Sequence, residues 1–439
     1  KIKDLKSKGY DLEQILKQYN DNGVFIDYII SNYYHINNGP DLRDYQIEAV
    51  KEAKFTFTHT SNKNYKLFWC CGLGKTKTAI TIAKQLNLKT ILIGFPSILL
   101  LEQFFEDLKL FYPVSTILKY CSEYSSNSLD NKLENLLISN KRYKIVLTTY
   151  HSSNKILSMI NKLDFMFDFV ILDEAHHLHS KKSVLFKCII DIPYKKRLLL
   201  TATPFIGEET KTLLSLEKSI NFKGISNTKS VSWAIKNNFI ADYNIIILRF
   251  NQSDLNLYSF NSFKNKDLVL AAFMALKCIF NNKSKKLLIY CNKIQNAKKI
   301  QKIIRIFLDK YDSNINLFNN KNLRLDVGNY ELNGSDNYEQ RKKIIKLFTN
   351  REYGIMSSVQ LFGEGYDYPG LDSVLFAEKM NSPIRIVQSA LRPCRKDKYN
   401  LHKKANILLP IFENNDNKLK HILLELKTLE NIFNKIKIF

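Results

Sequence analysis

Apolar and polar positions alternate along most of this chain in segments of strand and helix length. From residue 41 onward, short apolar runs are followed by stretches whose apolar residues recur at helical spacing. These runs predict buried strands at 66–70, 90–94, 144–148, 169–172 and 197–200. Strands that alternate with helices favour a parallel sheet joined by crossover helices, and ligands bind such sheets at the carboxyl ends of the strands.

A second series of the same kind begins near Asn244. It predicts strands at 244–248, 286–291, 354–357 and 373–377, with helices to about 280 and at 294–308, 339–348 and 384–391. The polar stretch 221–230 separates the two series. We therefore expect four parts: an N-terminal helical extension (1–38), a first lobe (39–228), a second lobe (229–412) and a C-terminal helix (413–439).

Composition excludes two broad classes. The 28 Phe and 23 Tyr residues are too many for a disordered polyelectrolyte. The longest apolar run, 91–101, contains Pro96 and is shorter than the roughly 20 residues of a membrane-spanning helix, so we expect no membrane association. Residues 1–20 are charged throughout and do not resemble a signal peptide. The chain starts at Lys1 rather than Met, which suggests a piece of a longer protein or a processed product.

The net charge and the cysteines indicate the class of binding partner and the cellular compartment. The net charge of +24 fits a protein that follows a phosphate backbone, although a lysine-rich solvated surface gives the same number. Only 11 of the 66 basic residues are arginine, so each is a candidate for a role that needs the guanidinium fork. Seven cysteines without a Cys-x-x-Cys pair predict a reducing, intracellular compartment, with nucleus, cytoplasm and viral factory not distinguished.

The segment Cys71-Gly72-Leu73-Gly74-Lys75-Thr76 follows a predicted strand and opens a predicted helix. Glycines let backbone N–H groups approach phosphate oxygens, a lysine reaches the β- and γ-phosphates, and a hydroxyl binds Mg²⁺. The strict phosphate-loop pattern is not met, because its first glycine falls at Trp69. A simple strand-to-helix turn with an exposed Lys75 is the alternative.

A second apolar strand ends in Asp173-Glu174-Ala175-His176. One carboxylate at such a strand end can hold Mg²⁺ while its neighbour orients and deprotonates a water molecule. An acidic turn is the alternative, and the glycine-rich segment about 100 residues upstream makes that alternative weak. His176, His177 and His179 could suggest zinc, but beside the two acids they fit the same box better.

Eight segments, in order over most of 41–400, resemble the motifs of superfamily 2 helicases with a DEAH-type box, and resemble restriction-type and viral DNA helicases most. Besides the two segments above, they are 42–46, 200–204, 234–243, the set Gly334, Arg341 and Phe348, 363–369 and 388–395. Trp69 and Cys70 depart from the small residues usual before the phosphate loop, and Leu391 replaces a usual glycine. The resemblance implies an α/β fold of two tandem RecA-like lobes, each a mostly parallel sheet flanked by helices, with short helical extensions at both ends.

The resemblance also implies ATP and Mg²⁺ as cofactors, with hydrolysis between the lobes. It assigns the catalytic roles to Glu174, Gln388, Arg392 and Arg395, and metal binding to Thr76 and Asp173. It assigns ATP binding to Arg43, Gln46, Gly72, Gly74, Lys75, Thr76, Gly365 and Asp367. The spacing of Arg392 and Arg395 places both on one face of a predicted helix, where they would act as arginine fingers.

Nucleic acid is the partner that the resemblance implies, bound through its backbone and without sequence readout. The implied contacts are Pro96, Ser97, Thr148, Thr149, Asn292, Lys293, Ser357 and Ser358. The leading hypothesis is an ATP-dependent helicase or translocase on DNA. An RNA helicase of the same superfamily is the first alternative, and a non-motor nucleic-acid-binding scaffold is the second. The scaffold reading predicts the loss of Lys75, Glu174 or Arg395, and all three are present.

Overall fold

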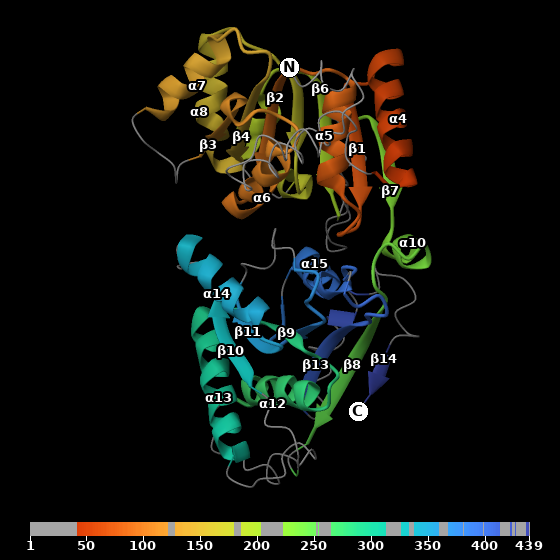
Figure 1. Ribbon diagram of the computed structural model, residues 1–439, viewed down its shortest axis with the longest axis vertical. Helices are drawn as coiled ribbons and strands as arrows, with labels where there is room; N and C mark the ends of the chain where they lie inside the picture. The colour runs from red at the N-terminus through yellow and green to blue at the C-terminus, as the bar shows by residue number, and fades with distance from the viewer. Residues whose placement is uncertain are drawn as a thin grey trace, which may run out of the picture. The chain divides into compact units, whose positions relative to one another are not determined.

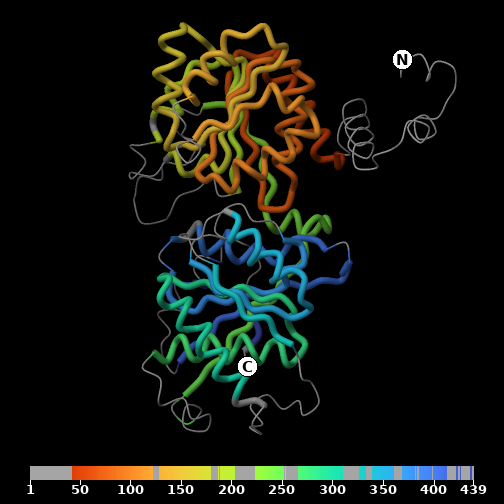
Figure 2. The backbone as a smooth tube through the Cα atoms, turned by 60° about the vertical axis from the view of Figure 1, so that its left-hand side comes forward, coloured from red at the N-terminus to blue at the C-terminus, as the bar shows by residue number. Residues whose placement is uncertain are grey.

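The computed structural model describes residues 42–121, 128–179, 186–202, 223–251, 253, 265–312, 326–332, 338–359, 368–380, 382–397, 399–412, 422–423, 426 and 436–438. The chain forms two compact units, and its last passage from the first to the second lies between Asn227 and Thr228. The predicted N-terminal extension lies outside the described residues. Figures 1 and 2 show that each unit has a central sheet with helices packed around it.

The first unit contains a seven-stranded sheet with the order β3-β4-β2-β5-β6-β1-β7. Its strands are β1 (Asn64–Trp69), β2 (Thr90–Phe95), β3 (Ile117–Tyr120), β4 (Lys144–Thr149), β5 (Phe167–Leu172), β6 (Tyr194–Thr201) and β7 (Ile225–Lys229). Its helices are α4 (Asp44–His59), α5 (Lys75–Gln85), α6 (Ile98–Lys109), α7 (Leu129–Ile138), α8 (Ser153–Lys162) and α9 (Lys187–Asp191). The pairs β3–β4, β4–β2, β2–β5 and β5–β6 are parallel.

The five strands predicted in this unit are those at the centre of the sheet. All six residues of β1 are buried, and β2, β4 and β5 each have only one residue that is not. Strands covered by helices on both faces of a parallel sheet are apolar on both sides, which is why the sequence shows them as continuous runs. The predicted parallel sheet is confirmed.

The second unit repeats this architecture, with the strand order β10-β11-β9-β12-β13-β8-β14. Its strands are β8 (Tyr243–Phe250), β9 (Lys286–Tyr290), β10 (Val327–Leu332), β11 (Tyr353–Ser358), β12 (Ser373–Phe376), β13 (Ala405–Phe412) and β14 (Ile436–Ile438). Its helices are α10 (Val231–Lys236), α12 (Lys266–Phe280), α13 (Ile294–Asp312), α14 (Tyr338–Asn350) and α15 (Pro383–Leu391). Each pair of neighbouring strands in this order is parallel.

Helix α12 forms the centre of the core of this unit. Of its 15 residues, 12 are buried, because it packs against α13 on one side and against β13 on another. A helix that is apolar around its whole circumference can be accommodated only in such an interior position. Among the described residues, no helix is both long and apolar enough to span a membrane.

The C-terminal tail differs from the prediction. We expected one amphipathic helix over 413–439, but Ile436–Ile438 forms β14, which pairs with β8 in parallel. Residues 422, 423 and 426 are helical, so the tail contains a helical part and then a strand. The partner strand β8 lies almost 200 positions earlier in the chain, so no local sequence pattern reveals this pairing.

Candidate functional site

Two glycines shape the 71–76 loop between β1 and α5. Gly72 has a φ of +85° and Gly74 a φ of +77°, in the left-handed region that residues with a Cβ rarely adopt. Gly74 is the N-cap of α5, so Lys75 and Thr76 form the start of the helix. The first N–H groups of a helix lack partners within it and carry the positive end of the helix dipole. The loop therefore has the geometry that a phosphate site needs.

Gln46 of α4 holds this loop from the side. Its side-chain Nε2 donates to the carbonyl oxygen of Gly74 at 3.3 Å, and its Oε1 accepts from the backbone N–H of Arg43 at 2.9 Å. A Cβ at Gly74 would overlap the Gln46 amide. The buried Gln46 thus positions the loop, while Arg43 is exposed. The adenine contacts expected of both residues stay predictions.

Asp173 follows β5 and is fixed through its backbone. Its N–H donates to the carbonyl oxygen of Gly94 at 3.0 Å, and its own carbonyl accepts from the hydroxyl of Tyr150. Tyr150 can reach that carbonyl only because it passes over a glycine: a Cβ at Gly94 would lie 2.8 Å from a carbon of its ring. Sequence reasoning missed both residues, since neither belongs to a recognisable motif.

Glu174 has the environment of a permanently ionised carboxylate. Its Oε2 lies 3.4 Å from Nδ1 of His176, and its backbone has a φ of +47°, which is uncommon for a residue other than glycine. Burial alone would raise its pKa. The hydrogen bond and charge of His176, together with the charges of Lys75 and His177, outweigh burial and lower the pKa to about 2.

These residues share one edge of the first sheet. The 71–76 loop follows β1 and Asp173 follows β5, and β6 lies between these two strands. Carboxyl ends of parallel strands meet at the same edge, where open α/β sheets bind ligands. The electrostatic effect of Lys75 on Glu174 is consistent with this proximity. The edge thus combines a cationic anion cradle with two carboxylates, a set that can bind phosphate, hold a divalent cation and activate water.

The described parts of the chain show no cluster of metal-binding side chains. No three or more His, Cys, Asp or Glu side chains within them gather closely enough to hold a metal ion. The rings of His176 and His177 contact each other in a tilted arrangement, with ring centroids 4.3 Å apart. None of the seven cysteines forms a disulfide; Cys70 is buried and Cys71 is half-buried, and both follow β1, which ends at Trp69.

The predicted nucleic-acid contacts of the first unit differ in accessibility. Pro96 and Ser97 are partly exposed at the end of β2, where Ser97 is the N-cap of α6. Thr148 and Thr149 end β4 but are buried. The Thr149 hydroxyl lies 3.1 Å from the hydroxyl of Ser152. This burial argues against direct contacts by the two threonine side chains.

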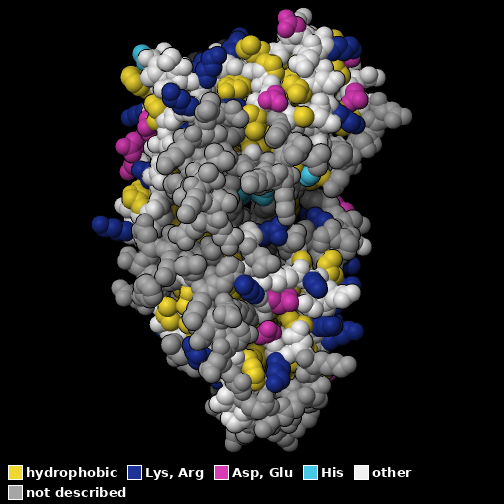
Figure 3. Space-filling view, turned by 180° about the vertical axis from the view of Figure 1, so that it is seen from behind, with side chains coloured by type: hydrophobic (Ala, Val, Ile, Leu, Met, Phe, Trp, Pro, Cys, Tyr) yellow, Lys and Arg dark blue, Asp and Glu magenta, His cyan; other side chains and the backbone are white. Residues whose placement is uncertain are grey.

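The predicted nucleic-acid contacts of the second unit also divide into exposed and buried residues. Asn292 and Lys293 are exposed after β9, and Asn292 is held by Glu378, whose Oε2 accepts from its backbone N–H at 2.9 Å. Ser357 and Ser358 are fully buried in β11. Ser357 Oγ accepts from Gln301 Nε2 at 2.8 Å. The Lys and Arg side chains of the described residues that Figure 3 shows are scattered among other side chains.

The predicted arginine pair is arranged differently from expectation. Helix α15 ends at Leu391, Arg392 opens a 3-10 turn, and Arg395 has extended backbone angles. Arg392 and Arg395 therefore do not share a helical face, and that prediction is wrong. Pro393 is the cause, because it lacks an N–H and its ring clashes with the preceding turn of a helix.

Of the remaining predicted site residues, two lie within the described part of the chain and two lie outside it. Gln388 is buried in α15. Burial lowers the pKa of Arg395, whose ordinary value is high enough that the guanidinium stays charged at neutral pH. Gly365 and Asp367 lie outside the described residues. The catalytic and ATP-binding roles of all four stay predictions.

Two sheets of seven parallel strands, each flanked by helices, are the tandem RecA-like lobes of superfamily 2 helicases. Comparison of the sequence agrees with this class. Residues 39–206 match the family described as "Type III restriction enzyme, res subunit", and residues 270–397 match "Helicase conserved C-terminal domain". The two matches relate the chain to superfamily 2 helicases and, with the viral relative below, to their restriction-type and viral members.

One similar protein is "Probable helicase A859L" of African swine fever virus, isolate Pig/Kenya/KEN-50/1950. It is 26% identical over 364 residues, which is 79% of this chain and 38% of the relative. This chain thus spans little more than a third of that relative.

Two solved structures share the fold. "ATP-dependent Type ISP restriction-modification enzyme LlaBIII bound to DNA" has a TM-score of 0.75 and 21% identity, covering 91% of this chain and 31% of the enzyme. "DEAD-box helicase Mss116 bound to ssRNA and UDP-BeF" has a TM-score of 0.61 and 17% identity, covering 94% of this chain and 77% of that one.

Proposed function

We propose that this chain is the motor of an ATP-dependent helicase or translocase that acts on DNA. The observation that carries the proposal is the shared sheet edge in the first lobe, where the 71–76 loop and the pair Asp173-Glu174 lie at the ends of parallel strands. The same edge would be expected of a nucleotide hydrolase in any α/β protein. The relation to superfamily 2 helicases supports the coupling of that hydrolysis to nucleic acid.

The residues at this edge fit a bound Mg²⁺–ATP. The N–H groups at the start of α5 and the Lys75 ammonium are donors for phosphate oxygens. Mg²⁺ prefers oxygen ligands and keeps several waters, so one hydroxyl and one carboxylate suffice from the protein. Thr76 and Asp173 supply these two groups. When bound, the metal neutralises the charge of the phosphates.

Glu174 has the properties of the residue that orients the attacking water. Its low pKa keeps the carboxylate able to accept a hydrogen bond from water at any pH at which the protein works. Asp173 and Glu174 thus differ in role, one turned to the metal and one to the water. Arg392 and Arg395 are proposed to reach the γ-phosphate, where a guanidinium fork stabilises the charge of the transition state.

DNA is preferred over RNA because of the relatives. The restriction-modification enzyme with the same fold is bound to DNA, and the matching family is named for a restriction enzyme subunit. The RNA-bound DEAD-box helicase shares the fold as well, so RNA remains the alternative substrate. Contacts to the phosphate backbone do not separate the two nucleic acids by themselves.

A turnover assay with single-stranded DNA, duplex DNA and RNA as separate activators tests the proposal. We expect DNA to stimulate ATP hydrolysis and a Lys75→Ala variant to lose it. Stimulation by RNA alone would transfer the proposal to an RNA helicase. ATP binding without hydrolysis under any of the three conditions would instead support a nucleic-acid-binding scaffold.

A further inference from the structure

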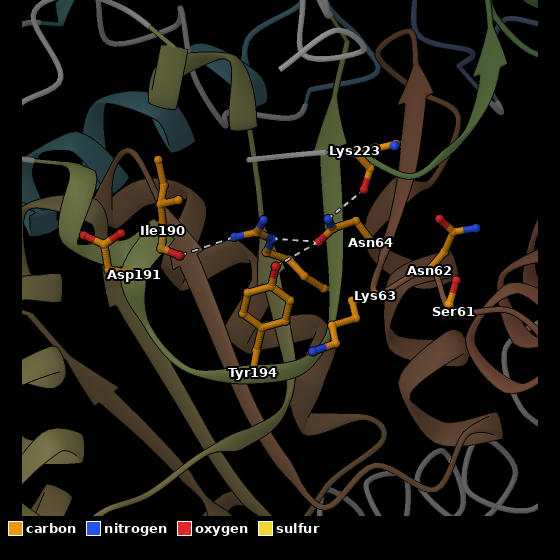
Figure 4. A pocket seen from close by; sticks show the side chains of 9 residues that line it. Ser61, Asn62, Lys63, Asn64, Ile190, Asp191, Tyr194 and Lys223 are labelled. Carbon is orange, nitrogen blue, oxygen red and sulfur yellow. Dashed lines mark hydrogen bonds between the residues drawn. The ribbon is translucent and has the colours of Figure 1, made fainter. Parts of the chain in front are cut away.

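A second concave site lies at the other edge of the first sheet, where β1 and β6 begin (Figure 4). It is a cavity of about 570 Å³, and its lining comes from three segments: 61–64, 190–197 and Lys223. The 71–76 loop follows the far end of β1. A strand of six residues spans about 20 Å, so the cavity is separate from the candidate nucleotide site.

Asn64 ties the three segments of the cavity together. Its Nδ2 donates to the carbonyl oxygen of Lys223 at 2.8 Å. Its Oδ1 accepts from Arg197 Nε at 3.0 Å and from the Tyr194 hydroxyl at 3.3 Å, as the dashed lines in Figure 4 show. Gly224 lets the third segment approach this closely, because a Cβ there would overlap the backbone of Asn64. These hydrogen bonds preform the walls of the cavity in the absence of a ligand.

Arg197 places a fixed positive charge in this wall. The side chain is 2% exposed, and its guanidinium lies over the ring of Tyr194 with 4.3 Å between the guanidinium carbon and the ring centroid. Nη1 donates to the carbonyl oxygen of Ile190 at 3.4 Å. Burial lowers the pKa of Arg197, but its ordinary value is high enough for the guanidinium to remain charged at neutral pH.

The described residues of the lining are mostly polar and cationic. Among them, Lys63, Arg197 and Lys223 bring three positive charges, and Asp191 is the one acidic residue. Lys63 and Lys223 are exposed, so their ammonium groups are free to move toward a ligand at the mouth. Phosphate is recognised by this combination of residues. The planar guanidinium of a fixed arginine donates directional hydrogen bonds, and the flexible lysines around it add positive charge.

We propose that this cavity binds a phosphate group, carried either by a small phosphorylated molecule or by a polynucleotide backbone. The site is distinct from the nucleotide site at the opposite edge and does not depend on ATP hydrolysis. A backbone phosphate held here would give the first lobe a nucleic-acid contact away from the residues that the helicase resemblance implies. A small phosphorylated molecule would make it an effector site.

Hydrogen exchange of the full chain tests the proposal. A Lys75→Ala background removes phosphate binding at the 71–76 loop. One arm adds sodium phosphate and the other adds an oligothymidylate, each compared with sodium chloride at the same ionic strength. We expect slower exchange at 61–64 and 190–197 in at least one arm. Protection by the oligonucleotide alone assigns the phosphate to a polynucleotide, and protection by inorganic phosphate assigns it to a small ligand.

Two double variants provide the comparison. Lys63→Gln with Lys223→Gln removes two exposed cations at the cavity, and the apparent affinity should fall about fivefold to tenfold, because exposed charges contribute only modestly to binding. Lys132→Gln with Lys155→Gln makes the same charge change on α7 and α8 and should leave the affinity unchanged. Equal losses in both variants, or no protection beyond that of chloride in either arm, would overturn the proposal.

Discussion

Oε2 of Glu174 lies 3.4 Å from Nδ1 of His176, and the side chains of the two residues are 13% and 2% exposed. The histidine compensates for the burial of the carboxylate, so that Glu174 stays ionised where desolvation alone would favour its protonated form. The role of His176 is thus to set the charge state of its neighbour. Two expected outcomes depend on this pair.

The first concerns the carboxylate itself. Glu174→Gln keeps the shape of the side chain but cannot accept a proton from water. We expect turnover to fall by a factor of about 10²–10⁴, the usual contribution of a general base. ATP affinity should change little, because the phosphates are held by the 71–76 loop. Steady-state hydrolysis and equilibrium binding of a fluorescent ATP analogue measure the two quantities. Wild-type turnover in the variant would remove Glu174 from the mechanism.

The second concerns pH. In the wild type, the Glu174 carboxylate protonates only near pH 2, so it should cause no loss of activity in mildly acidic buffer. His176→Ala removes the two largest interactions that lower the pKa of Glu174, and it leaves the burial that raises this pKa together with the smaller lowering effects of Lys75 and His177. The pKa of Glu174 should therefore rise above its wild-type value of about 2, and the acid limb of the kcat profile should move to higher pH with it.

His177→Ala is the matched control for that experiment. His177 contributes the smallest of the favourable effects on Glu174, so its removal should move the acid limb less. Profiles of kcat between pH 4 and 8 distinguish the three proteins. Coincident acid limbs in wild type and His176→Ala would show that the histidine does not control the carboxylate.

Gly74 is constrained by conformation and by space. Gly74→Ala places a Cβ on a left-handed residue, which costs about 1–2 kcal/mol, and brings that Cβ into overlap with the Gln46 amide. We expect lower stability in urea and weaker ATP binding. In a Gln46→Ala background the overlap disappears and only the backbone cost remains, so Gly74→Ala should cost less there. If Gly74→Ala lowers the unfolding free energy equally with Gln46 and with Ala at position 46, the overlap with the Gln46 amide does not contribute to the loss.

Two adjacent lysines should differ sharply in their effect on stability. Lys286 is buried, and its Nζ donates to the carbonyl oxygens of Phe348, Thr349 and Arg351 at the end of α14. Lys286→Met leaves these carbonyls without their donor and should cost about 2 kcal/mol of unfolding free energy.

Lys285 tests whether that cost depends on burial. Its ammonium is 2.7 Å from Glu352, but both side chains are more than half exposed. Lys285→Met should therefore cost less than about 1 kcal/mol, as for other exposed ion pairs. Urea denaturation measures the unfolding free energy of the two variants. Similar losses of unfolding free energy in both would mean that the hydrogen bonds from Lys286 to the end of α14 contribute little to stability.

In the first sheet, burial explains which strands could be predicted from the sequence, whereas in the second sheet β13 is almost wholly buried and was still not predicted. The central strands β1 and β5 are covered on both faces and therefore stand out as apolar runs. The edge strands β3 and β7 are mostly half-exposed, with sequences that mix polar and apolar residues, and we did not predict them. The residues that follow the central strands were predictable for the same reason, because strand ends locate the chemistry in this fold.

Side-chain positions were less predictable than strand positions. Ser357 and Thr148 follow the helicase pattern, yet both are buried, since the same small polar residues also satisfy hydrogen bonds inside the protein. Tyr150 positions Asp173 through a contact over Gly94 that depends on the order β4-β2-β5. Such contacts join segments that only the tertiary structure brings together, and no spacing in the sequence indicates them.

The exposed contacts of the second lobe give the last prediction. Lys293 follows β9 at the carboxyl edge of its sheet and is exposed, so it is the residue of the predicted set best placed to meet a phosphate. Lys293→Ala should weaken DNA binding for every sequence and reduce the slope of log K against log salt by about 1, the value for one lost phosphate contact.

Lys302 carries the same charge on α13, more than two helical turns beyond that edge, and it is also exposed. Lys302→Ala should leave the salt slope unchanged, since the contact is local rather than a consequence of net charge. Fluorescence anisotropy with a labelled oligonucleotide at several salt concentrations measures both slopes. If both variants reduce the slope of log K against log salt equally, binding depends on the overall charge of the lobe. The predicted phosphate contact at Lys293 would then be wrong. A loss confined to Lys293 would instead locate the phosphate track of the second lobe at the end of β9.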